Sequence, residues 1–91
     1  MTFFEWDENK EKSNLRKHKI SFDEAESVFS DMFSVTISDP DHSVEENRFI
    51  DIGMSENNRI LVVVYVEREE NIRIISARKA TRAERKIYEQ D

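Results

Sequence analysis

The chain has 91 residues and a formal net charge of −6, and apolar and charged residues each make up 37% of it. A chain of this length can build one small hydrophobic core, so a single domain spanning residues 1–91 is expected. The absence of cysteine excludes disulfides and thiolate metal sites. No apolar run approaches the roughly 18 residues that a transmembrane helix needs, and the N-terminus lacks a secretion-signal pattern. These features predict a cytoplasmic protein.

The N-terminal segment predicts a short strand followed by a polar helix. Phe3–Trp6 is an aromatic, strand-like opening, and Asp7 can cap a helix that continues over residues 8–18. Leu15 is the only strong apolar anchor in this helix. We therefore expect Leu15 and the neighbouring Trp6 to attach the helix to the rest of the protein.

A second helix and a strand follow. Ser21 and Glu24 form the pair of a capping box, in which each side chain accepts a hydrogen bond from the other residue's backbone amide. Four apolar residues then share one face of a short helix: Phe22, Ala25, Val28 and Phe29. Residues 33–38 predict a strand, and residues 39–43, which read Asp-Pro-Asp-His-Ser, predict a loop.

Three further strands form the predicted centre of the sheet. In residues 48–55 apolar side chains alternate with others, as in a half-buried strand. Residues 59–66 are apolar on both faces and predict the central strand. A charged hairpin loop over residues 67–71 leads to the last strand, residues 72–77.

The C-terminal segment predicts a helix over residues 81–89, which Thr81 and Glu84 open with a second capping box. One stripe of this helix is expected to lie on the sheet: Ala80, Ala83 and Ile87. Arg82 and Lys86 then follow its flank, and Arg85 and Glu89 face outward. The element order β-α-α-β-β-β-β-α predicts an α+β fold, a mostly antiparallel sheet with two N-terminal helices and one C-terminal helix.

Positive charge is concentrated near the C-terminus. Residues 1–58 contain 6 Lys/Arg and 14 Asp/Glu, whereas residues 59–91 contain 8 and 6; within residues 72–88 the counts are 6 and 1. Segregation of this kind can attract an anionic ligand to one face of an otherwise acidic protein, although a solvated basic helix is the alternative interpretation. The residues expected to gather at this anion site, here called the cationic corner, are Arg78, Lys79, Arg82 and Lys86.

Several segments together resemble the BrnT family, small toxins of bacterial and archaeal type II toxin–antitoxin pairs. They are FEWDENKEKSNLRKHKISFDEAESVF, SDPDHS, RFIDIGMS, RILVVVYVER and IRIISARKATRAERKIYE, in this order. The resemblance implies a RelE-like fold and a ribonuclease that cuts RNA and arrests translation. It also implies neutralisation by a BrnA-type antitoxin with a ribbon-helix-helix part, in a heterotetramer or larger complex that contacts operator DNA only through the antitoxin.

RNA cleavage without a metal needs a base for the 2′-hydroxyl proton, an acid for the leaving 5′-oxygen, and fixed cations for the charged phosphorane. Arg78, at the end of a strand, is the candidate for clamping this transition state, with Arg73 as a second catalytic arginine. The alternative role of Arg78 is an ion pair that ties the last helix to the sheet. Arg73 and Arg48 can belong to one RNA-binding surface or pair with acids across strands.

His42 is the candidate proton carrier, because histidine titrates near neutrality and this one lies in a predicted loop. RNA contacts are expected from Lys79, Arg82, Lys86, Arg48 and Trp6. Trp6 can stack on an unpaired base or pack against the first helix, and Tyr65 and Tyr88 can carry protons or pack in the core. The only tight group of metal-ligand types is Asp39, Asp41 and His42; an Asx turn explains its aspartates, so neither a metal nor a cofactor is expected.

A non-catalytic protein-binding subunit of a DNA-binding complex is the alternative function. In that case the cationic corner would receive acidic side chains of a partner or DNA phosphates. The acidic residues 1–58 oppose strong binding of a polyanion by the isolated chain, because long-range repulsion acts against it, but they do not prevent a local catalytic pocket.

Overall fold

The structure is a computed structural model that describes residues 2–39 and 47–90. Its strands form one sheet in the order β1-β5-β4-β3-β2. In chain order the elements are β1 (Phe3–Trp6), α1 (Glu8–His18), α2 (Phe22–Ser27), the 3-10 helix η1 (Val28–Ser30), β2 (Val35–Ser38), β3 (Arg48–Met54), β4 (Ile60–Arg68), β5 (Asn71–Lys79) and α3 (Arg82–Glu89).

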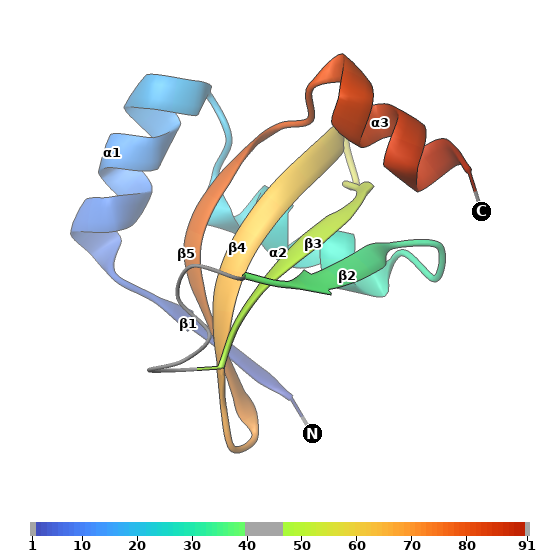
Figure 1. Cartoon of the computed structure of the whole chain (residues 1–91). Coiled ribbons are helices and arrows are strands. Elements are labelled where there is room, and N and C mark those ends of the chain that lie inside the picture. The colour runs from blue at the N-terminus through green and yellow to red at the C-terminus, as the bar shows by residue number, and fades with distance from the viewer. Residues whose placement is uncertain (1, 40–46, 91) are drawn as a thin grey trace.

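The sheet is mostly antiparallel, as the sequence predicts. β2, β3, β4 and β5 pair antiparallel in chain order, and β4 lies at the centre. The N-terminal strand β1 pairs parallel with β5, at the edge of the sheet. This pairing places the first residues of the chain beside the strand that leads to the C-terminal helix (Figure 1).

The helices hold different positions around the sheet. Figure 1 shows α1 alongside β5 and α3 at the upper end of β3 and β4, opposite the hairpin that joins β4 to β5. The main core lies between the sheet and the α2 region and contains Ile20, Phe22, Ala25, Val28, Leu61, Val63, Ile74 and Ala77. Within the described residues, no helix is long and apolar enough to cross a membrane.

Helix α1 is attached through a buried asparagine, and the prediction that Leu15 anchors it is wrong. Leu15 remains 47% exposed, whereas Asn14 is buried. The Asn14 amide donates to the carbonyls of Ile20 (3.0 Å) and Ala77 (2.8 Å) and accepts from the Ala77 amide (3.1 Å). These bonds satisfy the buried side chain and join α1 to the C-terminal half of β5.

Helix α2 starts at its predicted cap, but the predicted box forms only in part. The Ser21 hydroxyl accepts from the Glu24 amide at 3.1 Å. The Glu24 carboxylate does not return the bond; it accepts from the Ser55 hydroxyl at 2.7 Å and from the guanidinium of Arg59. Glu24 therefore holds the β3–β4 turn against α2.

Two predicted boundaries are displaced. Phe33 precedes β2 and is 64% exposed, because the Asp31 carboxylate accepts its backbone amide and holds a turn there. The predicted hairpin loop over residues 67–71 is shorter in the structure, since strand pairing continues to Arg68 and Asn71. Glu69 makes this tight turn possible by adopting a left-handed backbone with φ 53°.

Helix α3 begins with the predicted capping box, but the predicted apolar stripe does not pack on the sheet. Thr81 and Glu84 exchange both capping bonds. Ala83 and Ile87 are exposed, and Ile87 has 45% of its surface accessible. The half-buried side chains of α3 are Glu84 and Tyr88, which are one turn apart. Helix α3 is therefore attached by polar groups.

Candidate functional site

Arg78 is engaged by α3. Its two terminal nitrogens donate to the two oxygens of Glu84 at 2.7 and 2.8 Å. This bidentate bond holds the pKa of Glu84 down at about 2. The structure thus contains the ion pair between helix and sheet that is the alternative role of Arg78, and a direct contact of Arg78 with RNA stays a prediction.

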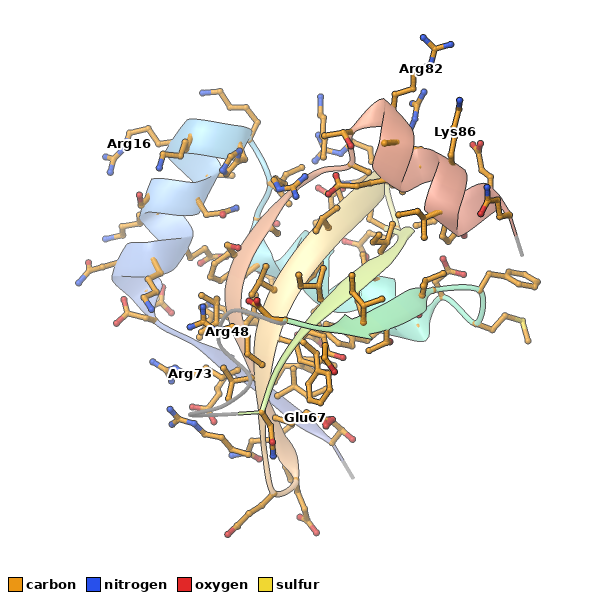
Figure 2. The ribbon with its side chains drawn as sticks, viewed as in Figure 1. Arg16, Arg48, Glu67, Arg73, Arg82 and Lys86 are labelled. Carbon is orange, nitrogen blue, oxygen red and sulfur yellow. The ribbon has the colours of Figure 1, made fainter. Side chains whose placement is uncertain are left out.

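The other members of the cationic corner point in different directions. Figure 2 shows Arg82 and Lys86 projecting from α3 away from the sheet. They lie on the opposite side of α3 from Glu84, whereas Lys79 lines a cleft together with Arg85. The corner is therefore divided into an outer helix face, an ion pair and a cleft.

Arg73 occupies the opposite end of β5 from Arg78. Its Nη1 donates to the Glu5 carboxylate at 2.9 Å, and Glu5 also accepts from the Asn71 amide at 3.2 Å. The acid comes from β1, because the parallel register sets Glu5 opposite Arg73. Arg73 and Glu5 keep 28% and 37% of their side chains exposed, so this pair borders on solvent.

Arg48 joins Arg73 on the same face of the sheet. The register sets Arg48 opposite Val66 and Val66 opposite Arg73. Directly opposite residues share a face of the sheet. Neighbouring strands lie about 4.8 Å apart, and β4 separates β3 from β5, so the Cα atoms of the two arginines are roughly 10 Å apart. Figure 2 places both at the lower end of the sheet. We call Glu5, Arg73 and Arg48 the lower-edge cluster.

Trp6 packs with the core. Its ring meets Phe22 edge-on at 5.9 Å, and Phe22 is fully buried. Trp6 therefore packs on Phe22 of α2, whereas the sequence analysis predicts packing against the first helix. A stack of Trp6 on an RNA base stays a prediction.

His42 lies outside the described residues, as does Asp41. Of that group the structure describes Asp39, which is buried. Among residues 2–39 and 47–90, no group of three or more His, Cys, Asp and Glu side chains is arranged to hold a metal ion. The role of His42 remains a prediction from the sequence.

Both tyrosines that can carry protons donate to carboxylates. The Tyr65 hydroxyl donates to Asp51 at 2.9 Å, and burial raises the pKa of Tyr65. The Tyr88 hydroxyl donates to Asp31 at 2.6 Å, and this bond raises the pKa of Tyr88 to about 12. Both groups therefore stay protonated at neutral pH and serve as donors in these bonds.

Glu5 and Arg85 belong to candidate sites in the structure, although the sequence does not indicate a site role for either. Glu5 pairs with Arg73, and Arg85 lies near Lys79. Glu5 could be found only from the β1–β5 register, which the sequence does not encode in an obvious pattern. Arg85, predicted to face outward, lines the cleft with Lys79. Glu84 points toward the sheet. Arg85 is the next residue and is rotated about 100° around the helix axis, which places it at the border of the helix where the cleft lies.

The lower-edge cluster combines a carboxylate with two cations on one face of the sheet. A carboxylate can accept a proton, and guanidinium groups can stabilise a phosphate that gains negative charge. This arrangement suits phosphodiester chemistry.

Comparisons with known proteins agree with this fold and identify the family. Residues 6–84 match the family model described as "Ribonuclease toxin, BrnT, of type II toxin-antitoxin system". The crystal structure of the Brucella abortus ribonuclease toxin BrnT is similar with a TM-score of 0.70 at 22% identity, over 90% of this chain and 100% of that one, a likeness of fold. No significant match was found among curated proteins. Because the family model matches most of its length, this chain belongs to the BrnT family of ribonuclease toxins of type II toxin–antitoxin systems.

Proposed function

We propose that this chain is an endoribonuclease toxin that cleaves RNA without a metal ion and thereby inhibits translation and growth. The observation that carries the proposal is the lower-edge cluster, in which Arg73 is paired with Glu5 at 2.9 Å and shares a sheet face with Arg48. The two guanidinium groups can supply the positive charge that a metal ion supplies in other nucleases. Membership of a ribonuclease toxin family supports the same activity.

In the proposed reaction, Glu5 removes the proton of a ribose 2′-hydroxyl. The 2′-oxygen then forms a bond to phosphorus, and the bond from phosphorus to the 5′-oxygen breaks. Arg73 and Arg48 stabilise the charge on the phosphorane oxygens. The leaving 5′-oxygen takes a proton, for which His42 is the candidate donor from the sequence. The products are a 2′,3′-cyclic phosphate and a 5′-hydroxyl.

Glu5 is preferred as the base over Glu67, another acid near this end of the sheet. Glu5 contacts Arg73 directly, so a phosphate held by Arg73 would lie near its carboxylate. Glu67 is opposite Ile72, the neighbour of Arg73 on β5, and its side chain therefore starts on the other face. The two carboxylates can be separated by experiment.

Purified protein should cut single-stranded RNA in excess EDTA and leave cyclic phosphate ends. Glu5→Gln keeps the size of the side chain but removes the base and the charge that pairs with Arg73, so kcat should fall by about 10²- to 10⁴-fold. Glu70→Gln, at the exposed hairpin, is the matched control.

Three results would contradict parts of the proposal. Cleavage that EDTA abolishes would exclude the metal-free reaction. A large fall of kcat in Glu67→Gln with a nearly unchanged kcat in Glu5→Gln would transfer the role of base to Glu67. Growth arrest with intact RNA, when the chain is induced in bacteria without its partner, would favour a non-catalytic binding subunit.

We further propose that the antitoxin is a BrnA-type ribbon-helix-helix protein that covers α3 and the adjoining turn. The Asp31 carboxylate accepts from the Met54 amide (2.8 Å) and from the Tyr88 hydroxyl (2.6 Å), which joins three segments at one point. Large apolar side chains stay exposed on these segments, namely Met32, Phe33, Met54 and Ile87. A partner can bury them and thereby gain affinity.

Hydrogen exchange of the free and bound chain tests this surface, because it reports which amides the partner covers. Protection should rise across α3 and residues 31–34. Complex mass, measured by light scattering, tests the expected heterotetramer or larger assembly. New protection confined to α1 and α2 would show that the antitoxin binds elsewhere.

A further inference from the structure

A cleft of about 330 Å³ lies at the end of the sheet opposite the lower-edge cluster. It is bounded by the β3–β4 turn, by the end of β5 and by α3. Met54 and Ile60 give it apolar walls, and its charged lining consists of Arg59, Lys79 and Arg85. The sequence predicts an RNA contact for Lys79, and Met54 belongs to the surface proposed for the antitoxin, but neither assignment treats the cleft as a binding site.

The three cations of the cleft are not equivalent. Arg59 is neutralised by Glu24, to which its Nε donates at 2.9 Å and with which its Nη2 forms an ion pair. In contrast, the side chains of Lys79 and Arg85 make no ion pair or hydrogen bond with any residue in the ranges 2–39 and 47–90. Among the described residues, the cleft therefore carries two positive charges that no ion pair neutralises.

Both charges are attached to well-fixed backbone. The Ala80 amide donates to the Ile60 carbonyl at 2.9 Å and fixes the end of β5, which carries Lys79. The Thr81 capping box and the Arg78–Glu84 pair fix the first turn of α3, which carries Arg85. A ligand would meet two cations whose main chains need no rearrangement, and this lowers the entropic cost of binding.

We propose that the cleft binds a backbone phosphate of the RNA substrate, away from the scissile bond. The Lys79 ammonium and the Arg85 guanidinium would contact its oxygens, and the walls formed by Met54 and Ile60 would accept the adjoining sugar or base. This inference rests on the proposed function, since it assumes that the chain acts on RNA. Lys79 is six residues from Arg73 on β5, so the cleft lies roughly 20 Å from the lower-edge cluster.

The arrangement suits a phosphodiester better than a carboxylate from a partner protein. A phosphate can offer oxygens in several directions to two cations on different elements, one a compact ammonium and the other a planar fork. A single carboxylate offers two oxygens in one plane. Lys79 is opposite Leu61 and Arg73 is opposite Val66, so the two side chains start on opposite faces of the sheet, and an RNA chain that reached both sites would pass around the end of the sheet.

The test uses single-stranded RNA with 2′-O-methyl groups at every position, which lacks the attacking hydroxyl and stays intact. Lys79→Gln and Arg85→Gln should each weaken its binding by about 3- to 10-fold at moderate salt. The slope of log K against log salt should decrease by roughly 0.7 when the phosphate contact is lost. On cleavable RNA the same variants should raise KM and leave kcat nearly unchanged.

Arg16→Gln is the matched control, because Arg16 projects from α1 away from the sheet (Figure 2). It removes one positive charge without altering the cleft. Arg82→Gln with Lys86→Gln tests the competing prediction that the outer face of α3 binds RNA. Melting temperatures should stay close to that of the unmodified chain, since the Lys79 and Arg85 side chains are exposed and make no ion pair within the described ranges.

Binding by Lys79→Gln and Arg85→Gln that equals binding by Arg16→Gln would refute the phosphate site. Normal RNA binding with weaker antitoxin binding would also refute it and assign the cleft to the partner. A different result would separate this inference from the proposed function. If the chain binds the methylated RNA through Lys79 and Arg85 but cuts no RNA, the cleft stands and the catalytic proposal fails.

Discussion

The two ends of β5 carry arginines in contrasting environments. Arg78 directs both terminal nitrogens to the two oxygens of Glu84, a partner only six positions away. Arg73 makes one such bond, to Glu5 on β1, and lies on the same face as Arg48. When both terminal nitrogens of a guanidinium donate to a carboxylate, the arginine stabilises the fold. When some of its N–H donors are not used and a second cation is close, it can bind a phosphate. The same residue type on one strand therefore suits two roles.

The largest expected effect concerns activity. Arg73→Lys keeps the charge but loses the planar fork, so kcat should fall by about 100-fold while the melting temperature changes little. Arg78→Lys should retain activity within a few-fold. Rates on a fluorescent single-stranded RNA measure both. A greater loss in Arg78→Lys, with an unchanged melting temperature, would place the transition-state clamp at the α3 end, as the sequence predicts.

The next effect concerns stability. A double-mutant cycle with Arg78→Gln and Glu84→Gln should give a coupling energy of about 1 kcal/mol, a value reduced for partial solvent exposure. Each single variant should lower the melting temperature by about 5 °C. The equivalent cycle for Arg73 and Glu5 should give less than about 0.5 kcal/mol, because one bond joins that pair. Equal coupling energies would remove the contrast between the two ends.

Low pH should weaken the attachment of α3 through Arg78 and Glu84. The pKa of Glu84 falls from 4.5 to about 2 on folding, because Arg78 stabilises its ionised form. Its contribution is therefore present above pH 4.5 and is lost as the pH falls toward 2. Between pH 5 and pH 3 the free energy of unfolding in urea should fall by about 1 kcal/mol more in the unmodified chain than in Glu84→Gln. An identical acid loss in Glu84→Gln would show that other carboxyl groups control it.

The smallest effect concerns the second polar attachment of α3. Tyr88→Phe removes the bond to Asp31 and should cost about 0.5 kcal/mol. The pKa of Tyr88 rises from 10.0 to about 12 on folding, so this bond stabilises below pH 10 and is lost as the pH rises toward 12. Unfolding at pH 9 and pH 11 should therefore differ less in Tyr88→Phe than in the unmodified chain. An unchanged difference would exclude Tyr88 as its source.

Local patterns determined much of the fold. The Thr81 box, the Asp7 cap and the Ser21 cap all start helices where the sequence predicts, because capping depends on residues within one turn. The apolar run over residues 59–66 became the central strand, since only a strand covered on both faces is apolar throughout. Family membership was also contained in the sequence, in segments that span nearly the whole chain.

Tertiary structure decided which helix faces are attached and which charges meet. Apolar periodicity pointed to Leu15 and Ile87, yet Asn14 and Glu84 make the attachments, because a polar side chain with a fully matched partner can replace apolar burial. Glu5 and Arg73 are 68 positions apart and meet only through the parallel β1–β5 register. Local sequence cannot fix such a register, because it depends on the packing of the whole sheet.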